Sequence, residues 1–213
     1  MAGCCDPRGC DDVFRAGFAG RVAKRYRRRG LDEAATRLVD FLAADGLAGA
    51  TVLDIGGGVG EIGLELLRRG AGSVVTLELS TAYDEEAHRL ARQAGVADRM
   101  HRQIVDIAAS PSQVAPADLV VLHRVVCCYP DHERLLGAAA DHCRRRLAFS
   151  HPPRTLTSRA LLAAENALYA VRGREFRTFA HPPAEMLAVL TAHGLRPVMT
   201  RPDRVWHVQG LAR

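Results

Sequence analysis

The sequence predicts an α/β fold in which a parallel sheet is covered by helices on both faces. Short apolar runs typical of buried strands alternate with amphipathic runs typical of helices, and a glycine-rich turn joins the first strand to the helix that follows it. Glycines also end several of the helical patterns. Because a helix between two strands carries the chain back to the same end of the sheet, such alternation favours parallel pairing.

The first half of the chain begins this alternation with a core-facing helix. Over 31–44, Leu31, Ala35, Leu38 and Leu42 share one helical face, and Gly46 ends the pattern. Buried strands are then predicted over 51–55 and 73–79, and between them a helix over 61–70 is ended by Gly70.

The next helix starts at the capping signature Thr81-x-x-Asp84 and stops at Gly95. It carries four apolar residues on its inner face, Ala87, Leu90, Ala91 and Ala94. Three more strands are predicted over 101–105, 118–122 and 146–150, and a helix over 131–143 connects the last two.

The last part of the chain contains a longer helical stretch over 155–171, which is predicted to be an inserted lid or substrate-facing helix. Its apolar side consists of Leu161, Ala164, Leu168 and Val171. A final helix is predicted over 184–194, and a terminal hairpin over 196–200 and 204–212.

Composition indicates one domain. The chain has 213 residues, 48% of them apolar, and no apolar run approaches the ~20 residues that span a bilayer. The start, MAGCCDPRGC, has no signal-like hydrophobic segment, so a cytoplasmic protein without a membrane partner is predicted. The net charge of +5 includes the basic run RVAKRYRRRG, which is typical of a solvated helix face; because aromatic residues are few, nucleic acid is not favoured as a partner.

The glycine-rich turn VLDIGGGVGEIG (52–63) suits a nucleotide cofactor, and two cofactors compete for it. Read from Gly58, the turn matches GxGxxG and Glu78 follows 20 residues later, as in NAD-dependent oxidoreductases. That fingerprint should begin where the strand ends, whereas here Asp54 and two glycines intervene. Read as Asp54-x-Gly56-x-Gly58-x-Gly60, the turn is the pattern of S-adenosylmethionine enzymes, in which the acid faces the ammonium group.

Three acids follow three successive predicted strands. Asp54 ends the first, Glu78 ends the second and Asp106 follows the third, so all three are expected in one crevice at the carboxyl edge of the sheet. Glu78 is expected to bind the ribose hydroxyls, and Asp106 the adenine amino group. The predicted cofactor site comprises Asp54, Gly56, Gly57, Gly58, Gly60, Glu78, Leu79, Asp106, Ile107 and His123.

With these residues, the sequence resembles class I S-adenosylmethionine-dependent methyltransferases over about 35–213. A weaker resemblance to magnesium-protoporphyrin O-methyltransferases is carried by His123, Tyr129-Pro130, the segment 149–155 and the segment 179–181. The resemblance implies a Rossmann-like, seven-stranded, mostly parallel sheet with the last strand antiparallel. It also implies that residues 1–34 form a lid segment and that about 155–181 is a helical insertion.

The resemblance further implies methyl transfer to a small molecule, with O-methylation as the expected chemistry. Transfer depends mainly on positioning, and a base is needed only when the acceptor must lose a proton. His123, which leaves the fourth strand, and Tyr129 are the candidate catalytic residues, although His123 could instead only line the cofactor pocket.

The cysteines leave a further alternative open. Cys4, Cys5 and Cys10 precede the core, and Cys127 and Cys128 follow the fourth strand. In a reducing compartment these are thiols, and thiolates bind soft ions, so methylation of a thiol-bound metalloid is an alternative function. The spacing lacks any CxxC pair, so no metal site is predicted.

Overall fold

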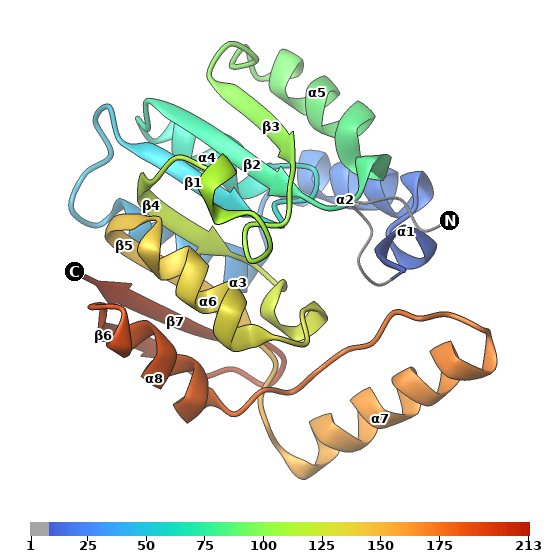
Figure 1. Cartoon of the computed structure of the whole chain (residues 1–213). Coiled ribbons are helices and arrows are strands. Elements are labelled where there is room, and N and C mark those ends of the chain that lie inside the picture. The colour runs from blue at the N-terminus through green and yellow to red at the C-terminus, as the bar shows by residue number, and fades with distance from the viewer. Residues whose placement is uncertain (1–8) are drawn as a thin grey trace.

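The computed structural model describes residues 9–213, so the predictions for Cys4 and Cys5 lie outside the described residues. It confirms the predicted fold class, because seven strands form one sheet with helices on both faces (Figure 1). Along the chain the strands are β1 (Thr51–Ile55), β2 (Ser73–Glu78), β3 (Met100–Ile104), β4 (Ala117–Leu122), β5 (Cys143–His151), β6 (Arg196–Arg201) and β7 (His207–Ala212). Predicted and observed bounds differ mostly by a residue or two, but β5 extends three residues before its predicted start and β7 begins three residues after its predicted one.

The strand order across the sheet is β3-β2-β1-β4-β5-β7-β6. Strands β1 to β5 pair in parallel, whereas β7 runs antiparallel to both β5 and β6, as the terminal hairpin requires. The order reverses between β1 and β4, which are neighbours in space. In open α/β sheets a ligand crevice forms outside the carboxyl ends of the strands at such a reversal.

The helices form two layers, each over its own hydrophobic core. Helices α2 (Ala16–Arg29), α3 (Glu33–Ala43), α4 (Glu61–Arg68) and α5 (Asp84–Gln93) cover one face, and α6 (His132–Asp141) and α8 (Pro183–Ala192) cover the other (Figure 1). Side chains of strand β4 alternate between the two cores: Leu119 and Val121 lie in the first core, and Val120 and Leu122 lie in the second. Apart from the half-buried Asp118 this strand is buried, and it ends at the reversal point.

The predicted cap of α5 is wrong. Ser80, not Thr81, caps this region: its side-chain oxygen accepts a hydrogen bond from the Ala82 N–H at 3.2 Å. One 3₁₀ turn, η1 (Thr81–Tyr83), then precedes α5 and shifts the α-helical start to Asp84. The hydroxyl that matches the capping pattern therefore lies one residue too late in the chain.

Two helices lie outside the layers. The short α1 (Cys10–Val13) precedes α2, and α7 (Leu156–Val171) stands apart from the sheet (Figure 1). The predicted apolar side of α7 is largely exposed, since Leu161 is 72% and Val171 86% exposed. Its half-buried side carries Leu162, Glu165 and Tyr169 instead. Within residues 9–213, no helix combines the length and the apolar character needed to cross a membrane.

Candidate functional site

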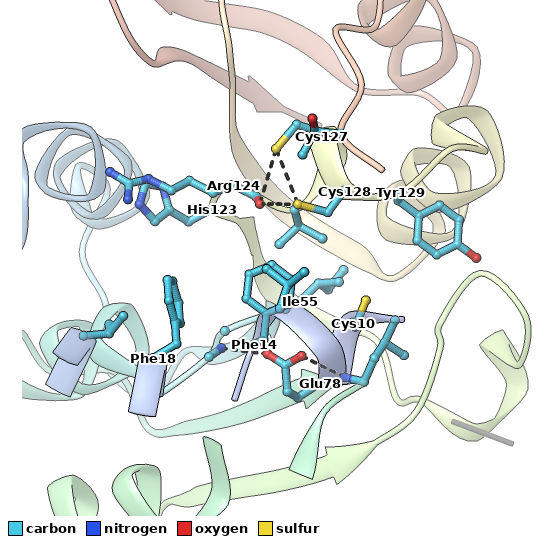
Figure 2. A pocket seen from close by; sticks show the side chains of 18 of the residues that line it. Cys10, Phe14, Phe18, Ile55, Glu78, His123, Arg124, Cys127, Cys128 and Tyr129 are labelled. Carbon is cyan, nitrogen blue, oxygen red and sulfur yellow. Dashed lines mark hydrogen bonds between the residues drawn. The ribbon is translucent and has the colours of Figure 1, made fainter. Parts of the chain in front are cut away.

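A cavity of about 840 Å³ lies at the carboxyl ends of β1 and β4, where the strand order reverses. Its walls come from the sheet edge, from α1 and α2, from α7 and from the β6–β7 turn. Figure 2 shows Phe14 and Cys10 across the open space from Cys128. Because pockets for a single ligand span about 300–1,000 Å³, a cavity near the upper end of that range has room for a cofactor and a small second molecule.

Asp54 lies beneath the glycine turn and is almost fully buried. Neither of its carboxylate oxygens has a hydrogen-bond partner within residues 9–213. Burial, together with the nearby carboxylates of Glu61 and Glu78, raises the pKa of Asp54 to about 7. A buried acid without partners is costly, so a cationic ligand group in the cavity would satisfy it.

The glycine turn leaves no space for side chains. A Cβ at Gly57 would lie 2.5 Å from Asp54 Oδ2 and 2.7 Å from Thr76 Cγ2, and one at Gly56 would lie 2.5 Å from Val125 Cγ2. Gly56 and Gly58 also have positive φ angles of 64° and 56°, which favour glycine. Gly60 is buried at the start of α4 and, unlike the other predicted glycines, does not line the cavity.

Replacement of Gly57 by alanine should lower the free energy of unfolding by about 1–3 kcal/mol, because the methyl group must displace the buried Asp54 or Thr76. Chemical denaturation measures this change. Gly17→Ala is the matched control: a Cβ there meets nothing within 4 Å, and the site is helical, so this variant should be as stable as the parent. Equal stability of both variants would contradict the tight packing of the turn.

The Glu78 side chain holds the glycine turn in place by accepting hydrogen bonds from backbone N–H groups. Its carboxylate accepts from Gly58 N–H at 3.0 Å and from Leu79 N–H at 2.8 Å. Burial raises the pKa of Glu78, opposed by these hydrogen bonds and by Arg102. Arg102 supports the turn from the other side, since it donates to the Gly58 carbonyl at 2.8 Å and pairs with Asp84 at 3.1 Å.

Asp106 and Tyr129 lie together at the far side of the cavity. The Tyr129 hydroxyl donates to Asp106 Oδ2 at 2.8 Å, and Ala108 N–H donates to Oδ1 at 2.9 Å. These contacts fix the Asp106 side chain in the cavity wall next to Ile107. They give Tyr129 a positioning contact with Asp106, and its catalytic role stays a prediction.

His123 occupies the end of β4 within a polar network. Its Nδ1 lies 3.0 Å from Ser150 Oγ, and its Nε2 lies 3.9 Å from Asp32 Oδ2 without a hydrogen-bond partner among the described residues. Burial lowers the pKa of His123, although Asp32 opposes the shift, so the imidazole is neutral at pH 7.

Asp32 is also the N-cap of α3, where it accepts from Ala35 N–H at 3.0 Å. Burial opposes its ionisation, but contacts with His123, this amide and Arg124 outweigh burial and hold the pKa of Asp32 well below its usual range. Arg124 donates to Asp32 at 2.7 Å. The network thus contains a neutral base beside a permanent carboxylate.

An aromatic wall closes the cavity opposite the sheet. Phe14 packs edge-on against Phe18 and Phe176 with centroid distances of 5.6 and 5.3 Å, and Phe176 packs in turn against Tyr169 of α7 at 5.6 Å. The ring centroid of Tyr83 lies 6.3 Å from that of Phe14. The amino-terminal segment and the segment that follows α7, which are distant in sequence, therefore meet over the cavity.

Sequence motifs do not identify the site contacts of Asp32, Arg102 and Ser150. Each contacts the site from an element distant in sequence, and although Ser150 lies in the segment 149–155, nothing in that segment indicates its contact with His123. Asp32 does carry a helix N-cap signal, but that signal indicates a structural role and not a site.

The described cysteines near the cavity are Cys10, Cys127 and Cys128. The sulfur atoms of Cys127 and Cys128 lie 3.7 Å apart, and both thiols donate to the Arg124 carbonyl (Figure 2). The hydrogen bond to Cys127 and burial raise the pKa of Cys128 well above its usual value, so it is a protonated thiol at pH 7. Among the side chains that the structure describes, those of residues 9, 10 and 13–213, no group of three His, Cys, Asp or Glu could hold a metal ion.

Comparison with known proteins identifies a family model and related folds. The model of the methyltransferase domain matches residues 24–200. No curated protein sequence matches the chain. Among solved structures, magnesium protoporphyrin IX methyltransferase from Synechocystis PCC 6803, with bound SAH, is 22% identical with a TM-score of 0.72, and the match covers 95% of this chain and 99% of that one.

Two further structures share the fold. An O-methyltransferase family protein from Burkholderia thailandensis is 16% identical with a TM-score of 0.71, covering 92% of this chain and 58% of that one. Geranyl diphosphate C-methyltransferase from Streptomyces coelicolor A3(2) is 18% identical with a TM-score of 0.67, covering 92% and 83%. The compounds named for two of these proteins, magnesium protoporphyrin IX and geranyl diphosphate, differ widely, so the shared fold by itself specifies no acceptor.

Proposed function

This chain belongs to the methyltransferase family, and we propose that it transfers a methyl group from S-adenosylmethionine to an oxygen atom of a small molecule. The observation that carries the proposal is the buried, unpartnered carboxylate of Asp54 beneath a glycine turn, in the same cavity as Glu78 and Asp106. This arrangement suits a ligand with an ammonium group, a ribose and an adenine. We also propose a cytoplasmic location, because the thiols of Cys127, Cys128 and Cys143 are free.

The cofactor residues then have distinct roles. Asp54 pairs with the ammonium group of the methionine portion, and the close-packed turn at Gly56 to Gly58 lets the ligand approach the backbone. Glu78 accepts hydrogen bonds from the ribose hydroxyls while its amide contacts fix its orientation. Asp106, held by Tyr129, accepts from the adenine amino group.

When bound, S-adenosylmethionine would supply a methyl group to the acceptor oxygen, and its sulfonium sulfur would leave with the electron pair of the S–CH₃ bond. His123 is the candidate base that takes the proton of an acceptor hydroxyl at Nε2. For this role Nδ1 carries the other proton and donates it to Ser150 Oγ, 3.0 Å away. Asp32, 3.9 Å from Nε2, stabilises the positive imidazolium that results.

Two alternatives are less well supported. An NAD-dependent oxidoreductase would place a pyrophosphate near the buried carboxylate of Asp54, where the charges repel, and the family match is to a methyltransferase. Methylation of a thiol-bound metalloid would need thiolates, whereas the pKa of Cys128 is raised.

Turnover tests the proposed function. The protein should release S-adenosylhomocysteine from S-adenosylmethionine in the presence of some member of a panel of small phenols, alcohols and carboxylic acids, and mass spectrometry should find the methyl group on oxygen. Tight binding of S-adenosylmethionine without turnover on any member would contradict an enzymatic role. Methylation of nitrogen, carbon or sulfur alone would contradict O-methylation.

Removal of the ribose-binding carboxylate should weaken cofactor binding. Glu78→Ala is expected to reduce the affinity for S-adenosylhomocysteine by about 1–3 kcal/mol, or about 5- to 150-fold, because charge-assisted hydrogen bonds to the ribose and the support of the turn are lost. Isothermal titration calorimetry measures the change. Glu85→Ala, at an exposed glutamate of α5, is the control and should bind like the parent. An unchanged dissociation constant for Glu78→Ala would remove this residue from the site.

A further inference from the structure

Most of the charged side chains that line the cavity are grouped by sign. The acids Asp54, Glu78 and Asp106 lie at the ends of β1, β2 and β3, as described above, and two further acids, Glu61 of α4 and Glu165 of α7, line the cavity elsewhere. The cations line other walls: Arg21 and Arg25 belong to α2, Arg124 follows β4, and Arg204 lies in the β6–β7 turn. An adenosyl cofactor with its cationic sulfonium suits the acidic side. The cofactor therefore does not explain why arginines line the other walls of the cavity.

Arg124 is the most constrained of these arginines. Its φ of 61° makes it the only described non-glycine residue with a positive φ, a conformation that costs about 1–2 kcal/mol. Its backbone N–H donates to Ser150 Oγ at 2.9 Å, its guanidinium donates to Asp32, and the same guanidinium lies 4.9 Å from the ring centre of Trp206. Such strain persists only where the surroundings fix the residue, and it is common at ligand sites.

Arg124 and Arg25 line the cavity, and each keeps one donor without a partner. Their Nε atoms are buried, and neither has a hydrogen-bond partner in the described part of the chain. Asp32 lies 2.7 Å from Nη2 of Arg124 and 3.6 Å from Nη2 of Arg25, and Glu61 lies 3.9 Å from Nη2 of Arg25, so these carboxylates neutralise charge without using either Nε. A buried donor without a partner costs about 1–3 kcal/mol, which a ligand oxygen would recover once the guanidinium turns toward the cavity.

The walls near these donors are apolar and aromatic. Trp206 stacks with Arg124, and Phe14, Phe176 and Tyr169 close the opposite side. Planar guanidinium groups recognise carboxylates through paired N–H donors, and flat side chains favour flat ligands.

Resting on the proposed function, we propose that the methyl acceptor is an aromatic carboxylic acid whose carboxylate is anchored by Arg124, with Arg25 as a second donor. Because Arg124 directly follows His123 in the chain, a carboxylate anchored there holds the rest of the acceptor beside the imidazole. In this arrangement the carboxylate is an anchor, and a separate hydroxyl is the oxygen that His123 deprotonates.

The test is a binding comparison on the protein saturated with S-adenosylhomocysteine. Matched pairs of flat aromatic acids and their primary amides, such as 2-naphthoate and 2-naphthamide, are titrated by calorimetry. We expect the acids to bind at least ten-fold more tightly than the amides, and Arg124→Gln to remove that preference. Arg124→Lys should restore part of it, since charge returns without the planar donor pair. Arg201→Gln, at an exposed arginine of β6 outside the cavity, should bind like the parent.

The outcomes separate this proposal from the proposed function. Equal binding of acids and amides, or no binding of the acids, overturns the carboxylate anchor while binding of S-adenosylhomocysteine still stands. If Arg124→Gln, with an unchanged circular dichroism spectrum, loses affinity for S-adenosylhomocysteine but not for the acids, Arg124 serves the cofactor and the proposal is wrong. Failure of the parent protein to bind S-adenosylhomocysteine would instead count against the proposed function.

Discussion

Replacement of Asp54 by asparagine should reduce the affinity for S-adenosylhomocysteine by about 2–5 kcal/mol, or about 30-fold to several thousand-fold. The carboxylate is buried and has no hydrogen-bond partner among the described residues, so its pairing with the ligand ammonium group is not shared with solvent, and Arg102 is a nearby cation that does not hydrogen-bond to it. Asparagine has nearly the same shape as aspartate, so the loss of affinity measures the effect of removing the negative charge. Asp118→Asn is the control: Asp118 bonds to Thr51 at the opposite end of the same strands and does not line the cavity.

The same variant should change how pH acts on the free protein. The pKa of Asp54 is about 7 in the folded state and about 4 in an unfolded chain, so the folded state holds the proton more tightly between these values. The free energy of unfolding of the parent therefore receives a contribution that falls as pH rises from about 4 to about 7. Asp54→Asn should lack this contribution, and denaturation at pH 5 and pH 8 compares the two. An identical pH dependence in both proteins would mean that Asp54 is ionised like an exposed acid.

The cofactor affinity of the parent should increase with pH, whereas its free energy of unfolding decreases. Binding of an ammonium group requires the ionised form of Asp54, so affinity should increase as pH rises through about 7 and decrease again where the ligand ammonium group loses its proton. Calorimetric titrations at several pH values, in buffers of different ionisation enthalpy, would detect the proton released on binding. Binding to Asp54→Asn should release no proton from residue 54.

The second large effect is expected at His123. His123→Asn should reduce the methylation rate of a hydroxyl acceptor by about 10²- to 10⁴-fold, the usual contribution of a general base, and change the affinity for S-adenosylhomocysteine far less. Asparagine retains polarity but cannot take the proton. In the parent, the rate should be constant near pH 7 and fall as pH drops through the pKa of His123, which burial holds below its ordinary value.

A matched variant separates proton transfer from packing. Ser150→Ala removes the contact at Nδ1 but leaves the imidazole, so it should lower the rate less than His123→Asn does. A His123→Asn enzyme with the parental rate would show that the imidazole only lines the pocket. An equal loss of cofactor affinity and of rate would assign His123 to cofactor binding.

The sequence could predict the fold because its signals were local and mutually consistent. Asp54, Glu78 and Asp106 each follow a predicted strand, and parallel pairing necessarily brings such positions to one edge of the sheet. The structure brings all three to one cavity. That they bind a cofactor remains a prediction for the experiments above.

Other parts of the site could not be predicted, because they depend on contacts between distant elements. Asp32 reaches His123 from the start of α3, and Ser150 reaches it from β5; neither position carries a sequence signal for this contact. The cap at Ser80 was not predicted, because Ser80 and Thr81 both carry a hydroxyl that could cap the helix and the sequence pattern does not distinguish them. The orientation of α7 was also beyond prediction, since periodicity defines a face but not what that face contacts.

The most direct measurement is a calorimetric titration of the unmodified protein with S-adenosylhomocysteine and, separately, with NADH. If the acids at the ends of β1, β2 and β3 form an adenosyl site with its ammonium partner at Asp54, S-adenosylhomocysteine binds at micromolar concentration and NADH produces no heat. Binding of NADH without binding of S-adenosylhomocysteine would contradict the assignment of this cavity.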